Sequence, residues 1–220
     1  MIKNKKGASN VTRIETGDGP TSVFILKKPE KYTLKQQLKR LKHKIRKYCV
    51  EKTIKCEPHS MDETADYIVN KCGLAEVDRE SGEFINEYTQ MRASFIIQYA
   101  PELLGEYAEI PKLKGESAED IKLHIEQAKE QMKRAMEVPQ SAFDIDMHKY
   151  KKVFGDVNDN IHIGIEKKYG YIGGGCSGGR KVRKEFNRIY KGIYRYYGVT
   201  REDIQSKSKR YVELVRTLSR

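Results

Sequence analysis

Apolar residues spaced three or four positions apart predict helices along most of the chain. The first of these helices covers residues 33–55, where one apolar stripe runs between faces rich in lysine and arginine. Its members are Leu34, Leu38, Leu41, Ile45 and Cys49. Similar stripes follow at 60–72, 81–100, 117–138, 180–197 and 200–219. The pattern therefore predicts about six helices.

Capping residues mark several of the helix ends. Thr33 and Thr200 suit the N-cap position, and Ser60 with Glu63 has the spacing of a capping box. Gly198 suits the position after a helix C-terminus, where a left-handed backbone is common. These signals support the helix boundaries that the apolar stripes indicate.

Between residues 142 and 172 the apolar period changes from that of a helix to alternation. Apolar and polar residues alternate over 143–147 and 161–165, and the turn-forming sequence 155–160 lies between them. This pattern predicts an antiparallel β-hairpin, with a third short strand at 169–172, followed by a glycine-rich loop at 173–179. The expected fold class is α+β, mostly helical, about six helices with one small antiparallel β-hairpin.

The composition along the chain divides it into an arm and one domain. Residues 1–31 are rich in Lys, Asn, Gly, Ser and Thr, which is typical of a flexible arm. Residues 32–220 are expected to form a single mostly helical domain, with the hairpin at about 142–172 and basic C-terminal helices at 180–219.

Charge is distributed unevenly around a net value of +12. Residues 27–55 hold 12 Lys and Arg against 2 Asp and Glu, and residues 147–220 hold 18 against 7. The acidic centre, residues 56–146, holds 9 against 20. The basic blocks can therefore neutralise the acidic centre within the chain, or bind an external anion such as nucleic acid. The sequence leaves both interpretations open.

The sequence has no apolar run long enough for a membrane-spanning helix and no secretory signal pattern. The four cysteines form no Cys-x-x-Cys pair, so reduced thiols are expected and a metal site is not. We expect a cytoplasmic protein with no membrane insertion. No catalytic signature is complete, and we expect neither catalytic residues nor a cofactor.

The segment 17–24 resembles a motif in the β subunit of sodium-translocating carboxylic-acid decarboxylases. The shared residues are Asp18, Gly19, Pro20 and Thr21, followed by a small, an aliphatic and an aromatic residue. In that membrane family the aspartate lies in a broken membrane segment and takes part in sodium and proton handling, so the resemblance implies that role for Asp18. The family's Gly-Ala step is replaced here, and charges at 13 and 15 interrupt the apolar lead-in. Sodium transport is not expected of a chain without a membrane span.

The chain also resembles small soluble bacterial proteins that share the arm, the basic helix after it, and an ending similar to 197–211. This resemblance implies a cytoplasmic location and no particular mechanism.

The glycine-rich stretch 173–180 is a candidate anion site. Backbone N–H groups of glycines can converge on an anion at a helix N-terminus, and cations follow here. The expected anion-binding residues are Gly178, Gly179, Arg180, Lys181 and Lys184. The P-loop pattern is incomplete, so the alternatives are a plain connection, or a Cys176 thiol activated by the helix start.

Basic stripes with interleaved aromatic residues indicate a candidate nucleic-acid surface. The predicted nucleic-acid-binding residues are Lys35, Lys39, Lys42, Arg46, Arg188, Lys191, Arg195 and Tyr194. A solvated surface explains the same stripes. His148 and His162 fall on the expected hairpin, where Asp144, Asp146 or Glu166 could be their neighbours. Exposed positions and an acid–base site are the alternatives.

The leading functional hypothesis is a non-enzymatic binding or regulatory protein whose basic helices contact nucleic acid or another polyanion. One alternative is a small enzyme or effector that binds a phosphate-bearing ligand at 173–180. Another is a protein–protein interaction module that uses the N-terminal arm.

Overall fold

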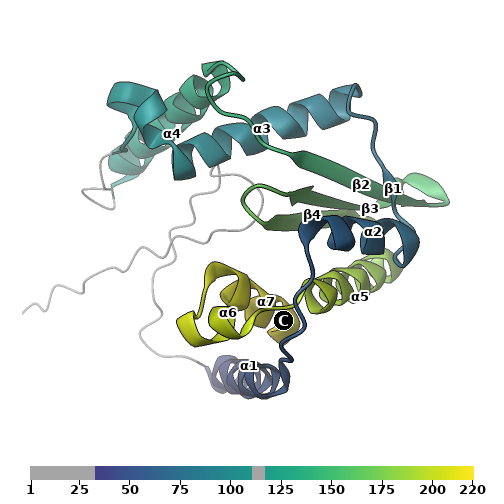
Figure 1. Cartoon of the computed structure of the whole chain (residues 1–220). Helices are drawn as coiled ribbons and strands as arrows, with labels where there is room; N and C mark the ends of the chain where they lie inside the picture. Colours follow the sequence, from purple (N-terminus) through teal and green to yellow (C-terminus); the bar gives the residue numbers. More distant parts are fainter. Residues whose placement is uncertain (1–32, 111–116) are drawn as a thin grey trace, which may run out of the picture. The chain divides into compact units, whose positions relative to one another are not determined.

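The computed structural model describes residues 33–110 and 117–220 of the chain. These residues fold into two compact units: residues 86–110 with 117–144, and residues 33–85 with 145–220. The expected acidic centre is therefore divided between the two units. Within the described residues there are seven α-helices, one 3-10 helix and a four-stranded sheet (Figure 1). The α+β class and the mostly helical content are confirmed.

The larger unit is built on an antiparallel sheet in the order β1–β2–β3–β4. Its strands are β1 (Ala75–Glu76), β2 (Met147–Phe154), β3 (Asp156–Glu166) and β4 (Tyr171–Ser177). The predicted hairpin is β2–β3, with Tyr150 opposite Ile163. Strand β1 was not predicted from the sequence. The expected glycine-rich loop at 173–179 is wrong over most of its length, because β4 continues through it to residue 177.

Helices α2 (Met61–Asn70) and α5 (Arg180–Tyr197) pack on one face of this sheet (Figure 1). The buried core between them contains Ile161, Ile163 and Ile165 of β3 with Ile189 and Ile193 of α5. Apolar residues alternate along β3 and recur every three or four positions along α5, so the isoleucines of each element lie on the face that packs in this core. The predicted apolar face of α5 is confirmed by the burial of 182, 189, 193 and 197.

Two helices, α6 (Arg201–Ser206) and α7 (Lys209–Ser219), replace the single C-terminal helix that was expected. The helix is interrupted at Lys207, which adopts a left-handed backbone with φ 51°. Ser208 then caps α7 by accepting the N–H of Tyr211. The Ser208 hydroxyl also donates to Asp203 at 2.6 Å. The hydrogen bond between Ser208 and Asp203 therefore stabilises the turn between α6 and α7.

Helix α1 (Leu34–Thr53) begins at a capping box formed by Thr33 and Gln36. It packs along α7, and its last turn reaches the core through Val50 and Ile54. No residue of α1 is buried. The apolar stripe found in the sequence is therefore exposed, with Leu38 59% and Leu41 54% accessible.

The smaller unit contains most of α3 (Gly82–Tyr99), the 3-10 helix η1 (Pro101–Tyr107) and α4 (Ala118–Glu137). Its core consists of Ala93, Ile96, Leu104, Met132 and Ala135. Buried Arg92 donates hydrogen bonds to the carbonyls of Phe143, Val138 and Pro139 at 2.7, 2.8 and 2.6 Å. These bonds hold the segment after α4 against α3.

Candidate functional site

Lysine and arginine side chains gather where α1 meets the end of α7. A groove of about 670 Å³ follows this junction, and the residues that line it include no carboxylate side chain. They are Lys39, Arg40, Lys42, His43, Lys44, Arg46, Ser219 and Arg220. Arg46 bridges the two helices, because its Nη1 donates to the backbone oxygen of Arg220 at 3.3 Å. Three of the predicted nucleic-acid residues thus line one groove.

Helix α5 adds two more of the predicted residues to this basic region. Burial is the main cause that lowers the pKa of Lys191, and repulsion from Arg195 and Arg46 lowers it further. Helices α1 and α5 both pack against α7, and the effect of Arg46 on Lys191 agrees with this arrangement. We call Lys39, Lys42, Arg46, Lys191, Arg195 and Arg220 the basic surface.

The remaining predicted nucleic-acid residues behave differently. Lys35 is exposed in the first turn of α1. Arg188 forms a two-pronged ion pair with Glu185, at 2.8 and 2.5 Å. Tyr194 is 3% exposed and donates its hydroxyl hydrogen bond to the carbonyl of Ile172 at 2.9 Å. Its assignment to the nucleic-acid surface is corrected, because a buried ring cannot stack on a base.

The candidate anion site at the start of α5 has a carboxylate beside it. Gly178 has φ 127°, and a Cβ at this residue would lie 2.4 Å from a carboxylate oxygen of Asp159. Gly179 caps α5 without a side-chain hydrogen bond, and Arg180, Lys181 and Lys184 are exposed on the first turns. The carboxylate competes with an external anion for this position. The geometry therefore does not favour a phosphate site here.

Two glycines of β4 lie against aromatic rings of the sheet, where a Cβ atom would collide with the ring. A Cβ on Gly175 would lie 2.9 Å from the His162 ring across the strand pair, and one on Gly173 would lie 2.3 Å from the Tyr171 hydroxyl. Cys176 follows them on the strand. Burial raises the pKa of its thiol, which opposes activation as a nucleophile. All four cysteines are free thiols.

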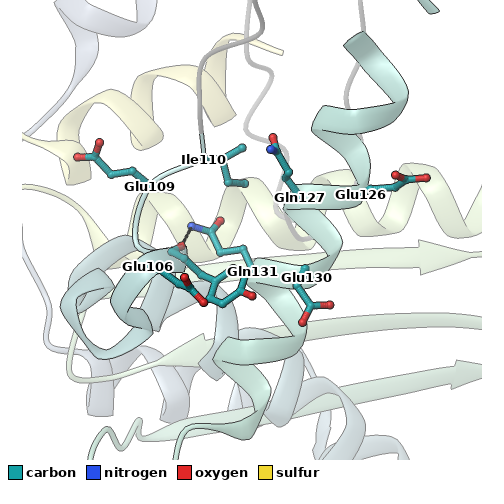
Figure 2. Close-up of a pocket in the computed structure, with 8 residues that line it drawn as sticks. Glu106, Glu109, Ile110, Glu126, Gln127, Glu130 and Gln131 are labelled. Carbon is teal, nitrogen blue, oxygen red and sulfur yellow. Dashed lines mark hydrogen bonds between the residues drawn. The ribbon is translucent and has the colours of Figure 1, made fainter. Parts of the chain in front are cut away.

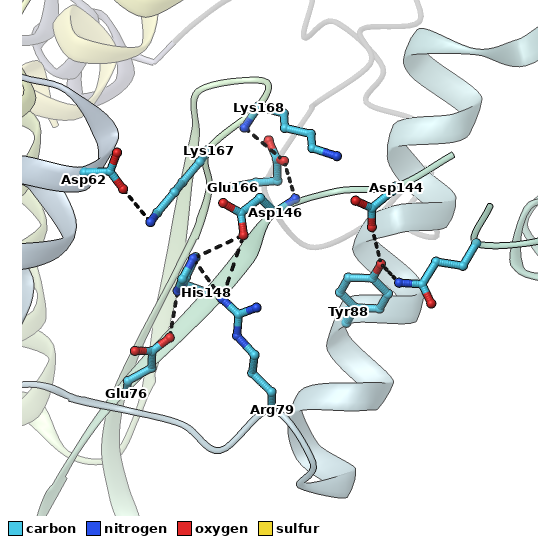
Figure 3. A network of polar contacts seen from close by, with 11 residues as sticks. Asp62, Glu76, Arg79, Tyr88, Asp144, Asp146, His148, Glu166, Lys167 and Lys168 are labelled. Atoms are coloured by element: carbon cyan, nitrogen blue, oxygen red, sulfur yellow. Dashed lines mark hydrogen bonds and ion pairs between the residues drawn. The ribbon is translucent and has the colours of Figure 1, made fainter. Parts of the chain in front are cut away.

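His148 lies at the centre of a polar network on the sheet (Figure 3). Its Nδ1 is 2.7 Å from Glu76, its Nε2 is 3.3 Å from Asp146, and Arg79 approaches both nitrogens at about 3 Å. The side chain is 14% exposed. Because both ring nitrogens are engaged by charged side chains, this geometry offers no nitrogen for proton transfer to a ligand.

Glu166 joins the same network through the N–H group of Asp146 (Figure 3). It is fully buried, and its carboxylate accepts hydrogen bonds from the N–H groups of Asp146, Lys168 and Tyr169. A carboxylate that accepts three backbone hydrogen bonds holds strand ends together. Its role is structural.

The smaller unit has a second hollow, of about 440 Å³, beside α4 and η1 (Figure 2). Four glutamates, at 106, 109, 126 and 130, are among its lining residues. Gln131 also lines the hollow and donates to the carbonyls of Tyr107 and Ala108 at 2.7 and 3.2 Å. In the same unit Tyr88 donates to Asp144 at 3.3 Å. This acidic hollow was not predicted from the sequence, because its residues come from segments about 20 positions apart.

The motif residues Asp18, Gly19, Pro20 and Thr21 lie outside the described residues. Over 33–110 and 117–220, no helix is long and apolar enough to cross a membrane, and no group of His, Cys, Asp or Glu side chains could hold a metal ion. Comparison of the chain with protein families, curated proteins and solved structures found no match.

Proposed function

We propose that the larger unit binds nucleic acid through the basic surface of α1, α5 and α7. The observation that carries this proposal is the groove between α1 and the end of α7, which cations of both line and whose lining includes no carboxylate side chain. The electrostatic effect of Arg46 on Lys191 supports the inclusion of α5. Backbone phosphates would replace repulsion between these cations with attraction. Other polyanions offer the same charge, so the experiment includes one without bases.

Binding is measured by fluorescence anisotropy with labelled DNA and RNA strands over a salt series, and with heparin as a polyanion without bases. Because each neutralised phosphate releases counterions, the logarithm of the affinity should fall linearly with the logarithm of the salt concentration. Absence of salt-sensitive binding at micromolar protein would refute the proposal. If heparin displaces the strands and the protein shows no preference for nucleic acid over heparin, the function is general polyanion binding.

Charge-reversal variants locate the interface. Lys42→Glu with Arg46→Glu should weaken binding by at least about tenfold, because hydrogen bonds to charged groups contribute roughly 1.5–3 kcal/mol each. The matched control is Lys122→Glu with Lys129→Glu, which makes the same charge change on exposed positions of α4. Equal losses in both double variants would show that net charge, and not the basic surface, determines the affinity.

A protein partner is the second candidate, favoured by the exposed apolar stripe of α1. Leu34, Leu38, Leu41 and Ile45 are 54–78% accessible, which is unusual for a row of residues on one helix face. A photoreactive amino acid at position 41 should cross-link one defined protein in cells. The same probe at position 47, off the stripe, should not. Equal products at both positions would remove this candidate.

A further inference from the structure

Three aromatic rings stack where α2 passes α5, beside the basic surface. The rings of Tyr67 and Tyr196 have centroids 4.3 Å apart and are inclined by 12°. The rings of Tyr196 and His59 are 3.9 Å apart and inclined by 20°. Two parallel rings cannot cover the same face of a third, so Tyr196 lies in the middle. The outer faces of the stack belong to Tyr67 and His59.

Hydrogen bonds and close packing fix the position of the stacked rings. The Nδ1 of His59 is 2.5 Å from the carbonyl of Tyr196, and Arg210 donates to the carbonyl of His59 at 2.9 Å. The Tyr67 hydroxyl lies over Gly192, where an added Cβ would be 3.4 Å away. Tyr67, Tyr196 and His59 are nevertheless only half-buried. The stack is thus a preorganised ring surface with part of its area in solvent.

Two arginines connect this stack to the cations of the basic surface. Arg188 and Arg195 lie four residues before and three residues after Gly192 on α5, so they flank the Tyr67 ring. Both oppose the rise that burial causes in the pKa of Tyr67, which agrees with this placement. Repulsion from Arg195 also lowers the pKa of Lys191, which belongs to the basic surface. A strand that follows the cations would therefore reach the aromatic stack.

We propose that Tyr67 is a base-stacking residue, supported by Tyr196 and flanked by Arg188 and Arg195, and that the ligand of the basic surface is single-stranded nucleic acid. This inference rests on the proposed function. Aromatic rings beside cations bind single strands without regard to sequence, because every base has a π face and the cations track the phosphates. In a duplex the base faces are already stacked on one another, so a duplex could contact only the cations.

The test compares three labelled ligands of equal length: a single strand, an abasic strand with the same phosphates, and a duplex. Wild-type protein should bind the single strand at least about tenfold more tightly than the abasic strand, within the range for stacking of one or more bases. Tyr67→Leu should abolish this difference and leave the abasic affinity and its salt dependence unchanged. Tyr67→Phe and Tyr67→Trp should retain it. Tyr99→Leu, in the smaller unit, is the control.

The chain contains no tryptophan, so Tyr67→Trp supplies a single fluorescent reporter. The single strand should quench this fluorescence and the abasic strand should not. Cross-linking of the unaltered protein to a strand with a photoreactive uracil should modify the peptide that contains Tyr67. This measurement needs no variant and remains informative if Tyr67→Leu unfolds.

The outcomes separate the two proposals. If none of the three ligands binds at low salt, the proposed function fails and this inference fails with it. If all bind with equal affinity, or Tyr67→Leu weakens the single and abasic strands equally, the basic surface stands and base stacking is overturned. Cross-links found only at other peptides overturn it as well.

Discussion

The buried carboxylate of Glu166 allows a sharp prediction about the stability of the sheet. Glu166 ends β3, and one of its oxygens accepts the N–H groups of Asp146 at 2.9 Å and Lys168 at 3.1 Å. The other oxygen accepts the N–H of Tyr169 at 2.6 Å. The side chain thereby joins the residue before β2 to the turn between β3 and β4. Its removal would take away the acceptor that these three N–H groups share.

Two substitutions at this position should have graded effects. Glu166→Gln keeps the size and one acceptor oxygen, but it points an NH₂ group at an N–H donor. One unsatisfied buried donor costs about 1–3 kcal/mol, and loss of the charge weakens the other hydrogen bonds. Glu166→Leu removes the acceptor of all three N–H groups and should cost at least about 3 kcal/mol of unfolding free energy.

Urea unfolding followed by circular dichroism measures these costs, and hydrogen exchange at residues 146, 168 and 169 gives a local measurement. Glu57→Gln, which makes the same chemical change at an exposed position, should change the free energy by less than about 0.5 kcal/mol. The reasoning is wrong if Glu166→Leu stays within about 1 kcal/mol of wild type, or if the three amides keep their protection in it.

Three further stability predictions concern other contacts. Arg210 donates to the carbonyls at 59, 197 and 198, so Arg210→Lys should lower the melting temperature nearly as much as Arg210→Met; full recovery with lysine would contradict this. Hydrogen bonds from two lysines of β2 lower the pKa of Glu83 from 4.5 to about 2. Stability from this carboxylate is therefore present above pH 4.5 and lost as the pH falls toward 2, and Glu83→Gln should flatten that part of the acid unfolding curve. Leu38→Ala and Leu41→Ala, as single variants at exposed positions, should each lower the free energy of unfolding by less than about 0.5 kcal/mol. Leu214→Ala in the core should lower it by about 2–5 kcal/mol, as measured by urea unfolding.

Local signals in the sequence predicted the helix ends well. Thr33 and Ser60 form capping boxes at the residues expected, because a cap depends on side chains only three positions away. Gly198 ends α5 with φ 60°. The hairpin was also predictable, since alternation over 161–165 places three isoleucines on the buried face of β3.

Elements that depend on distant partners were not predictable in this way. Glycine suggests a loop, yet the glycines of β4 accommodate rings from Tyr171 and His162, one of them on the neighbouring strand. The break after α6 depends on Ser208 and Asp203, whose pairing interrupts an apolar stripe that continues through it. The two-residue β1 has too short a pattern to detect, and only its pairing with β2 defines it.

The candidate site was predicted as separate stripes and not as one surface. The sequence indicated cations on α1 and α5, but α7 brings Arg220 to Arg46, and that contact spans 174 positions. Tyr67 was missed because it occupies a helical position with no special spacing. It becomes notable only through the rings of Tyr196 and His59 beside it. The aromatic residue that the sequence suggested, Tyr194, belongs to the core.

The two interpretations of the basic blocks apply to different parts of the chain. Cations of the sheet pair with acidic residues of the larger unit: Lys149 and Lys151 contact Glu83, and Lys167 contacts Asp62 at 2.6 Å. Cations of α1 and the end of α7 instead gather around a groove lined without acidic side chains, and Lys191 and Arg195 of α5 add to their mutual repulsion. Apolar packing of α5 and α7 in the core holds these like charges together at some cost in stability. A polyanion that binds only the folded state would offset that cost and raise the free energy of unfolding with its concentration. Charge repulsion built into the folded unit is thus the physical reason to expect an external anionic partner.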